Sequence, residues 1–540
     1  MDFSLPTSIE LSDLLGLAGL FVFVLSALAL AEILRRKNKV SGETSRKIVH
    51  LSVGNVIIIF PFVFTSVWYA LIGPVFFIPF TYFTSPASPI KKFKLKGVES
   101  GHAYGTVFYA ISLTVLVALF FHPYIPGEPI NQNNVIMLGA FLPLVWGDGI
   151  SAVIGSKFGH DKAYKIFGGT KTLLGSWAGA FATFISVTIG CLILFRTADS
   201  VAVCIYIGLL TGFVTAFIEA LTPKGFDNIA VPAANAIVLF GLYKLFEENL
   251  INLSETLSIV SIIVAAIIAV ILTSVSIIFK ALTWDGGMAG FYFGIIIFGL
   301  GSWTWGVIYF TFFILGSLSS FLGRKTKEGI SQEYEKGETA RDSVQAMVNS
   351  LIPAIMSFLI VLIRDESMIM IVGAGAIAVS LADTLGTELG SLSQHEPRLS
   401  TKPWVKVPRG TPGAISLLGL FSSMIGAAII AFIGLGVAQI DNLTKNLTVF
   451  HIPSAFLIFV VPVIIGGFLG AYTDSIFACT IQKMNKCIVC GKITEKKEHC
   501  NEQTIHNSGV KWLRNDFVNL FSIMVGSVFS LISYLILALI

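Results

Sequence analysis

A polar stretch between two apolar segments contains residues suited to binding a nucleotide. It reads WGDGISAVIGSKFGHDKAYKIFGGTKTLLGS over residues 146–176. Asp148 could hold Mg²⁺, because this ion prefers one or two carboxylates together with phosphate oxygens. Backbone N–H groups, hydroxyls and ammonium groups just before a helix suit a polyphosphate. The following loop supplies them from Lys157, Gly169, Thr170 and Lys171. The alternative for Asp148 is a solvated carboxylate at the end of a packing helix.

Other polar residues of the first half also lie at the ends of apolar segments. Glu219 closes one segment, and Asp227 with Asn228 opens the next. Charged residues near membrane depth indicate function, although Asp227 could instead cap its helix. Basic loops offer further phosphate partners. These residues are Arg46, Lys47, His50 and Lys96. For His50 the alternative is a histidine that simply lies at the membrane interface.

The second half of the chain repeats the pattern of the first. Aligning Asp148 with Asp383 places WGDGISAVIGS on LADTLGTELGS, so that Gly155 meets Gly390. GGTKTLLGS then faces RGTPGAISLLG, six residues further along in the second copy. Repetition over this length predicts two copies of one multi-helix unit.

The elements that must position these residues are membrane helices. Hydrophobic residues make up 54% of the 540 residues and charged residues only 13%, and the mean hydropathy is +0.82. A soluble globular chain is far less apolar. We count sixteen apolar runs of about 18 to 25 residues, the length that crosses about 30 Å of hydrocarbon. The sequence therefore predicts an all-α polytopic membrane protein with about 16 transmembrane helices, arranged as two parallel-oriented repeats of eight.

The basic residues predict how these helices are oriented. Of 36 lysines and arginines, 32 fall in alternate loops and four in the opposite ones. Because cytoplasmic loops keep the positive charges, we expect the polar motifs on the cytoplasmic side and both termini outside. The net charge of +4 then reflects topology, and we expect no nucleic-acid partner.

The two halves resemble two related kinase families. Residues 40–245 resemble the phytol kinase and dolichol kinase family of membrane CTP-dependent lipid kinases, through SRKIVHLSVGN, GDGISAVIGSKFG, TKTLLGS and EALTPKGFDNIAVP. Residues 256–540 are similar to the phytyl-phosphate kinase family, through RDSVQAMVNS, LADTLGTELGS, PRGTPGAISLLG and GAYTDSIFACTIQ. We therefore expect a fusion of two membrane domains, 1–250 and 251–540.

The resemblance implies a bifunctional isoprenoid kinase. One site would phosphorylate an alcohol such as phytol or geranylgeraniol, and the other would convert the isoprenyl monophosphate to the diphosphate, with CTP or another nucleoside triphosphate and Mg²⁺. Such transfers depend on positioning and charge neutralisation. The metal would lie at Asp148 and Asp383. The other catalytic candidates are Glu219, Asp227, Asn228, Glu388, Asp474 and Asp516. The second-site phosphate candidates are Arg341, Gln345, Asn349, Gly410, Thr411, Gly413 and Asn515.

An insertion at 481–514 has a chemistry of its own. It contains CIVCGKITEKKEHC, which provides Cys487, Cys490, His499 and Cys500. A C-x₂-C pair followed by a histidine and a third cysteine fits a small structural zinc site. A loop with reduced, unpaired thiols is the alternative.

Two other functions use similar features. A transporter could also be a duplicated helix bundle, although its ionisable residues should gather at the membrane midplane. A cytidylyltransferase would attack the α-phosphate of CTP and form a CDP-lipid. A homo-oligomer is compatible with the sequence under each of the three functions.

Overall fold

The computed structural model describes most of the chain. The described residues are 10–37, 42–85, 88, 104–159, 163–166, 169–195, 200–223, 225–247, 257–321, 340–363, 366–444, 456–491, 493–496 and 498–539. The chain forms two compact units, Met1–Leu257 and Ser258–Ile540, here called unit 1 and unit 2. The domain boundary expected between residues 250 and 251 falls in 248–256, outside the described residues.

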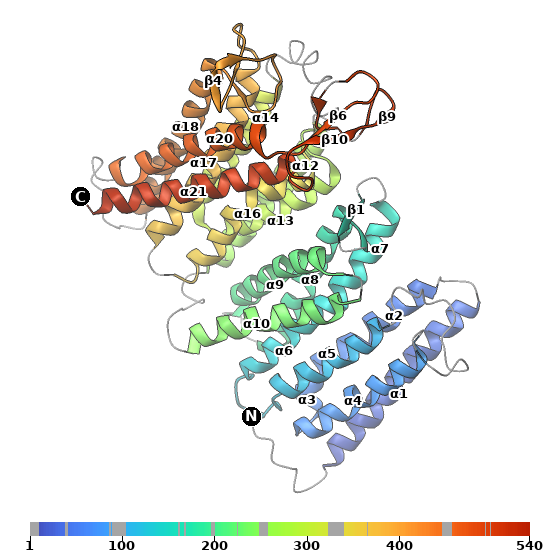
Figure 1. Ribbon diagram of the computed structural model, residues 1–540. Helices are drawn as coiled ribbons and strands as arrows, with labels where there is room; N and C mark the ends of the chain where they lie inside the picture. The colour runs from blue at the N-terminus through green and yellow to red at the C-terminus, as the bar shows by residue number, and fades with distance from the viewer. Residues whose placement is uncertain are drawn as a thin grey trace. The chain divides into compact units, whose positions relative to one another are not determined.

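Unit 1 is a helix bundle (Figure 1). Its helices are α1 (Leu11–Arg36), α2 (Gly42–Gly54), α3 (Phe60–Val63), α4 (Val67–Thr84), α5 (Gly105–Phe120), α6 (Gln132–Leu142), α7 (Asp148–Phe158), α8 (Leu173–Phe195), α9 (Val201–Leu221) and α10 (Asp227–Glu247). A 3₁₀ turn, η1 (Asn55–Ile58), follows α2, and a π-helical turn, η4 (Pro143–Gly147), joins α6 to α7. Strands β1 (Ala163–Ile166) and β2 (Gly169–Thr172) form an antiparallel hairpin between α7 and α8.

Unit 2 is a second helix bundle with more strands in its connecting segments. Its helices are α12 (Ile259–Ile278), α13 (Trp284–Leu300), α14 (Ser302–Phe321), α16 (Ser343–Ile360), α17 (Glu366–Gly390), α18 (Leu417–Thr444), η7 (Phe456–Val460), α20 (Val461–Thr480) and α21 (Asn515–Ala538). One antiparallel sheet has the order β4 (Lys402–Lys406), β3 (Arg398–Leu399), β5 (Ala414–Ile415). Another has the order β10 (Ile505–Ser508), β6 (Met484–Lys486), β7 (Ile493–Thr494), beside the pair β8 (Glu498–His499) and β9 (Glu502–Gln503).

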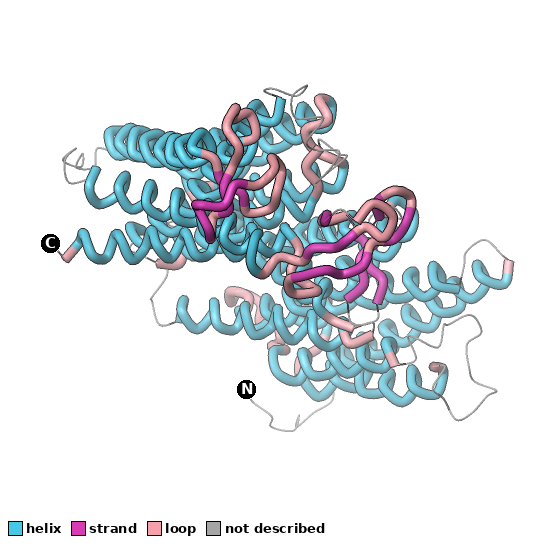
Figure 2. Tube along the Cα trace, turned by 45° about the horizontal axis from the view of Figure 1, so that its top comes forward, coloured by secondary structure: helices cyan, strands magenta, loops and turns pink. Residues whose placement is uncertain are grey.

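The membrane character predicted from composition is confirmed. Twelve helices within the described ranges are long and apolar enough to cross a membrane. The segments Lys47–Ile58, Gly105–Phe120 and Trp284–Leu300 are apolar but shorter. The figure of sixteen spans therefore stays a prediction, as does the repeat arrangement. The expectation of an all-α chain needs one correction, because short strands pair in the connecting segments (Figure 2).

Close helix contacts through glycine hold the polar loops in both units. A Cβ at Gly155 of α7 would lie 3.4 Å from the Cα of Gly175 in α8. A Cβ at Gly390 of α17 would lie 3.0 Å from the Cα of Gly419 in α18. Small residues allow membrane helices to approach this closely. In each unit the contact fixes the two helices that flank a polar loop.

Candidate functional sites

The first candidate site of unit 1 is built around Asp148. This residue begins α7 directly after the π-helical turn η4, within the continuous span Gln132–Phe158. The ammonium group of Lys47, from α2, donates to Asp148 Oδ2 at 2.5 Å and to its backbone oxygen at 3.0 Å. Lys47 is only 4% exposed. π-Helical turns are frequent at functional sites, and this one places a carboxylate beside a buried cation.

Lys171 brings the hairpin to the ends of two other helices. It is part of β2 and pairs with Tyr164 of β1. Its ammonium group donates to the backbone oxygen of Glu219 at the end of α9. The same nitrogen lies 3.8 Å from Glu219 Oε1 and 4.0 Å from Asp227 Oδ2 at the start of α10. One lysine therefore ties the hairpin to both acidic helix ends.

Glu219 carries an unsatisfied oxygen. Ser151 of α7 donates to Oε1 at 3.1 Å. Within the described part of the chain, the buried Oε2 has no hydrogen-bond partner. Asp148 and Asp227 lie near enough to interact with Glu219 electrostatically. A buried polar atom normally has a partner, so this oxygen suits a cation that the protein binds. The site has three carboxylates and two ammonium groups. This excess of carboxylates fits Mg²⁺, which prefers such oxygen ligands.

The remaining candidates of unit 1 differ in how they are placed. Asn228 Nδ2 donates to Asp227 Oδ1 at 3.1 Å, so these two predicted site residues are hydrogen-bonded to each other. His50 Nε2 lies 3.2 Å from the Leu144 backbone oxygen, at the π-helical turn. Lys157 is exposed, with its ammonium group 5.3 Å from the centre of the Phe158 ring.

Four candidates of unit 1 have no described side chain. Gly169 and Thr170 form β2 together with Lys171, and only their backbone is described. Arg46 lies in α2, but its side chain is outside the described part of the chain, and so is the whole of Lys96.

Unit 2 contains a polar pocket of about 320 Å³ where α17, α18, α20 and α21 meet the sheet β4-β3-β5. It brings together seven of the predicted residues, namely Asp383, Glu388, Gly410, Thr411, Gly413, Asp474 and Asn515. Gly410 and Gly413 adopt φ values of +85° and +72°, which other residues rarely adopt. A Cβ at Gly413 would also press against Ser475 and Cys479, so glycine is required where the loop crosses α20.

The other candidates of unit 2 lie elsewhere. Arg341, Gln345 and Asn349 line a separate, mainly apolar cavity between α12, α13, α14 and α16. Asp516 follows Asn515 in the first turn of α21 and is half-buried, and it is not among the residues that line the polar pocket. The polar pocket and the apolar cavity are thus two distinct sites in this unit.

Two residues that position the site residues, Ser151 and Asp285, are not predicted from the sequence. Ser151 holds Glu219, and nothing in its surroundings distinguishes it from a packing serine. Asp285, at the start of α13, accepts from Thr283 at 2.8 Å and from the backbone N–H of Ser343 at 3.1 Å. It thereby fixes the segment that carries Arg341. The available signal was an acidic residue directly before an apolar run, in the sequence TWDGG.

The four expected zinc ligands lie together. The ligand atoms of Cys487, Cys490, His499 and Cys500 are all within 4.8 Å of one another. Cys490 Sγ is 3.5 Å and Cys500 Sγ 3.1 Å from His499 Nδ1. A hydrogen bond from the backbone of Cys490 lowers the pKa of Cys487 to about 6, which favours the thiolate. Sulfur ligands about 3.8 Å apart are what Zn–S bonds of about 2.3 Å require, so the cluster fits zinc.

Comparison with known proteins gives related membrane proteins. The family model of the integral membrane protein DUF92 matches residues 267–527. The chain is 30% identical over 236 residues to phytol kinase of Synechocystis sp., which covers 43% of this chain and 93% of that protein. It is 30% identical over 270 residues to Protein PGR of Arabidopsis thaliana, covering 46% of this chain and 87% of that protein.

A third relative is an uncharacterized membrane protein of Methanocaldococcus jannaschii. It is 30% identical over 155 residues, which cover 29% of this chain and 62% of that protein. No solved structure matches the chain. Residues 267–527 therefore match the family of the integral membrane protein DUF92, and the chain is a homologue of phytol kinase over less than half of its length.

Proposed function

We propose that the chain is a membrane isoprenoid kinase with two active sites. Unit 1 phosphorylates an isoprenoid alcohol such as phytol or geranylgeraniol, and unit 2 phosphorylates the resulting monophosphate to the diphosphate. CTP with Mg²⁺ is the donor in this proposal. The observation that carries it is the cluster of Asp148, Glu219 and Asp227 with Lys47 and Lys171, in a chain homologous to phytol kinase.

In unit 1 the buried charges suit transfer to a neutral alcohol. The alcohol oxygen forms a bond to the γ-phosphorus of CTP, the bond from that phosphorus to the bridging oxygen breaks, and CDP leaves. Glu219 or Asp227 accepts the proton of the alcohol. Lys171 and the N–H groups of β2 hold the phosphates. Asp148, with the unsatisfied oxygen of Glu219, would bind Mg²⁺, which supplies neutralisation of the phosphate charge when bound.

In unit 2 the polar pocket suits the second transfer. An oxygen of the monophosphate forms the bond to the γ-phosphorus, and CDP again leaves. Thr411 and the backbone around Gly410 and Gly413 line this pocket together with Asp383 and Asp474. The two glycines leave backbone N–H groups close to the bound phosphates, while Asp383 would carry the metal.

The membrane placement belongs to the same proposal. The polar loops of both units would face the cytoplasm, where CTP is available, and both termini would lie outside. This follows from the 32 basic residues in alternate loops. A water-soluble donor then meets a membrane-bound acceptor at one interface.

The test compares products from matched variants. Purified full-length protein receives γ-labelled CTP and geranylgeraniol, and the lipid products are separated. Asp148→Asn should abolish monophosphate formation, a loss of about 100-fold or more, whereas Asp383→Asn should stall at the monophosphate. Label in pyrophosphate would instead identify a cytidylyltransferase. Full diphosphate yield from either variant would refute the site assignment.

We also propose that the insertion binds one structural zinc ion. Cys487, Cys490, His499 and Cys500 provide four ligands in a segment too short to form a core of its own. His506 lies outside this set, because its Nε2 is 3.0 Å from the Gly509 backbone oxygen.

A further inference from the structure

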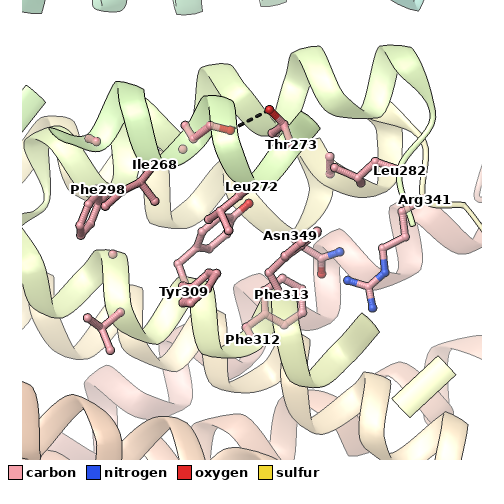
Figure 3. Close-up of a pocket in the computed structure, with 18 of the residues that line it drawn as sticks. Ile268, Leu272, Thr273, Leu282, Phe298, Tyr309, Phe312, Phe313, Arg341 and Asn349 are labelled. Carbon is pink, nitrogen blue, oxygen red and sulfur yellow. Dashed lines mark hydrogen bonds between the residues drawn. The ribbon is translucent and has the colours of Figure 1, made fainter. Parts of the chain in front are cut away.

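The apolar cavity of unit 2 has one charged end and one aromatic end. It has a volume of about 240 Å³ and lies between α12, α13, α14 and α16. Figure 3 shows Arg341 and Asn349 at one end, Phe298 at the other, and Leu272, Tyr309 and Phe313 between them. Carbon atoms therefore line most of its length, and the polar groups gather at one end.

Arg341 is held at the charged end by its backbone. Its N–H donates to the Ala281 oxygen at 2.9 Å, and its own oxygen accepts from the Thr283 N–H at 3.1 Å. The guanidinium lies 5.6 Å from the centre of the Phe312 ring. Among the described residues, its N–H groups have no hydrogen-bond acceptor and no ion-pair partner. A guanidinium fixed over an aromatic ring, with its N–H donors unpaired by the described side chains, suits a phosphate.

The aromatic end is formed by a pair of rings. The rings of Phe298 and Trp303 meet edge to face, with their centres 5.0 Å apart. Phe298 lies directly over Gly306, where any Cβ would overlap its ring. The ring therefore occupies the space that a side chain at position 306 would fill, at the end of the cavity opposite Arg341.

The distance between the two ends gives a length for the occupant. The guanidinium lies beside Gly316, since a Cβ there would be 2.9 Å from Arg341 Nη2. From Trp303 to Gly316 along α14 is about 20 Å, at about 1.5 Å per residue. An extended hydrocarbon advances about 1.25 Å per bond, so about 16 bonds span the cavity. That is the main chain of a diterpenyl group.

We propose that this cavity binds the acceptor of unit 2, an isoprenyl monophosphate, with its phosphate on Arg341 and its chain ending at Phe298, which limits the chain length. This inference rests on the proposed second kinase step. It separates the acceptor from the nucleotide, because the polar pocket is lined by other residues. Arg341 joins the two sites, since Thr384 also lies beside Gly316 and Glu388 interacts electrostatically with the guanidinium. Asp383 and Glu388 of the same helix line the polar pocket.

Chain length gives the sharpest test. Binding of farnesyl, geranylgeranyl and pentaprenyl monophosphates is measured on the full-length protein in detergent, without nucleotide. The wild type should bind the geranylgeranyl compound best. Phe298→Ala should improve binding of the pentaprenyl compound about tenfold, which is about 1.4 kcal/mol. The matched control is Phe291→Ala on the same helix, one heptad away, half-buried like Phe298 and not among the residues that line the cavity. An unchanged length preference in Phe298→Ala would refute the length limit.

The charged end is tested with ligands that share the geranylgeranyl chain and differ in their head group. Arg341→Gln should weaken geranylgeranyl monophosphate binding at least about tenfold and leave geranylgeraniol binding unchanged, and Arg341→Lys should recover part of the loss. Inorganic phosphate should bind far more weakly than the lipid. Equal binding of inorganic phosphate, or normal monophosphate binding by Arg341→Gln, would overturn the proposal.

These outcomes separate the cavity from the reaction. If the lipid binds as expected but γ-label never reaches it, the kinase function fails and the cavity stands. If diphosphate forms in Arg341→Gln with an unchanged KM for the monophosphate, the cavity fails and the kinase function stands.

Discussion

The two units use one pattern of helix contacts around different arrangements of charge. In both, a glycine of the helix that carries the central aspartate meets a glycine of the next helix, Gly155 with Gly175 and Gly390 with Gly419. In unit 1 two ammonium groups are built into the site and paired with carboxylates. In unit 2 the position aligned with Lys171 is Pro412, and Arg409 and His395 line the pocket together with acidic, hydroxyl and glycine residues. The helix contacts therefore do not dictate the charge of the site.

A serine and a glycine exchange places on the same helix pair in the two units. In unit 1, Ser151 of α7 packs against Gly179 of α8, whose Cβ would lie 2.9 Å from the serine Cβ. In unit 2, Gly386 of α17 faces Ser423 of α18. The serine and the glycine have changed helices, which keeps the packed volume and moves the hydroxyl. In unit 1 that hydroxyl binds Glu219, and in unit 2 it lines the polar pocket.

The difference fits the acceptors that we propose. A neutral alcohol brings no charge, so unit 1 can hold its cations for the nucleotide and its carboxylates for the metal and the proton. A monophosphate brings negative charge of its own. Unit 2 then needs a cation at the acceptor, and Arg341 supplies it from a different helix segment. The predictions below separate the roles of these cations.

The largest effect is expected from Lys171. Lys171→Met leaves Glu219 and Asp227 without their shared cation and removes a phosphate ligand, so alcohol phosphorylation should fall about 10²- to 10³-fold. Phosphorylation of supplied geranylgeranyl monophosphate by unit 2 should stay within about twofold. The matched control is Lys244→Met, because Lys244 is an exposed lysine in the last turn of α10 that pairs with Glu247 and is not a candidate site residue. Equal losses in both units would contradict two independent sites.

The next effect concerns the ion pair beside the π-helical turn. Lys47→Met leaves the half-buried Asp148 carboxylate, which lies near two other carboxylates, without this cation, and this should lower the stability of unit 1 by about 2 to 3 kcal/mol. The expected loss of stability is smaller than for a fully buried ion pair, because the Asp148 carboxylate is partly exposed. Thermal unfolding in detergent measures the loss. The double variant Lys47→Met/Asp148→Asn should recover part of it, and no recovery would mean that the pair is not a coupled unit.

The charged sites were predictable because their residues are rare in their surroundings. A carboxylate at the end of an apolar segment or a lysine in a glycine-rich loop is conspicuous, and the sequence predicts Asp148, Lys171, Glu219 and Asp227 as site residues. The repeat then pointed to the residues of the polar pocket in unit 2. Which cation meets which carboxylate was not predictable, because Lys47 and Asp148 are far apart in the chain and nothing local links them.

The apolar cavity and the short strands were not predictable for the opposite reason. Phe298, Tyr309 and Leu272 are apolar residues in apolar helices, so no local pattern separates a residue that lines a cavity from one that faces lipid. The sequence predicts Arg341 as a phosphate ligand. Its position beside the cavity, however, depends on Asp285 and on the pairing of two loops. The strands arise where connecting segments pair with one another, and such pairing depends on how the helices bring the loops together.

A smaller effect is expected at the shared glycine contacts. Gly155→Ala and Gly390→Ala should each destabilise their own unit by about 1 to 3 kcal/mol, because the added methyl group presses on the facing helix. Gly241→Ala and Gly436→Ala are the controls, since a Cβ at either position meets nothing within 4 Å. The controls should be neutral or slightly stabilising, by up to about 1 kcal/mol. A large loss at one contact only would show that the two units are not packed alike.

The smallest effect on catalysis is expected in the insertion, which only unit 2 carries. Cys490→Ser should remove zinc from the protein, measured as bound metal per chain, because three remaining ligands hold the ion far more weakly. Cys479→Ser is the control, since its thiol lies by Ser400 at 3.3 Å and outside the cluster. The alcohol kinase reaction of unit 1 should stay unchanged, and monophosphate phosphorylation should fall by no more than about threefold, as for a loop that supports the polar pocket from its edge. Full zinc content in Cys490→Ser would contradict the proposed ligands, and loss of the alcohol reaction would mean that the insertion serves both sites.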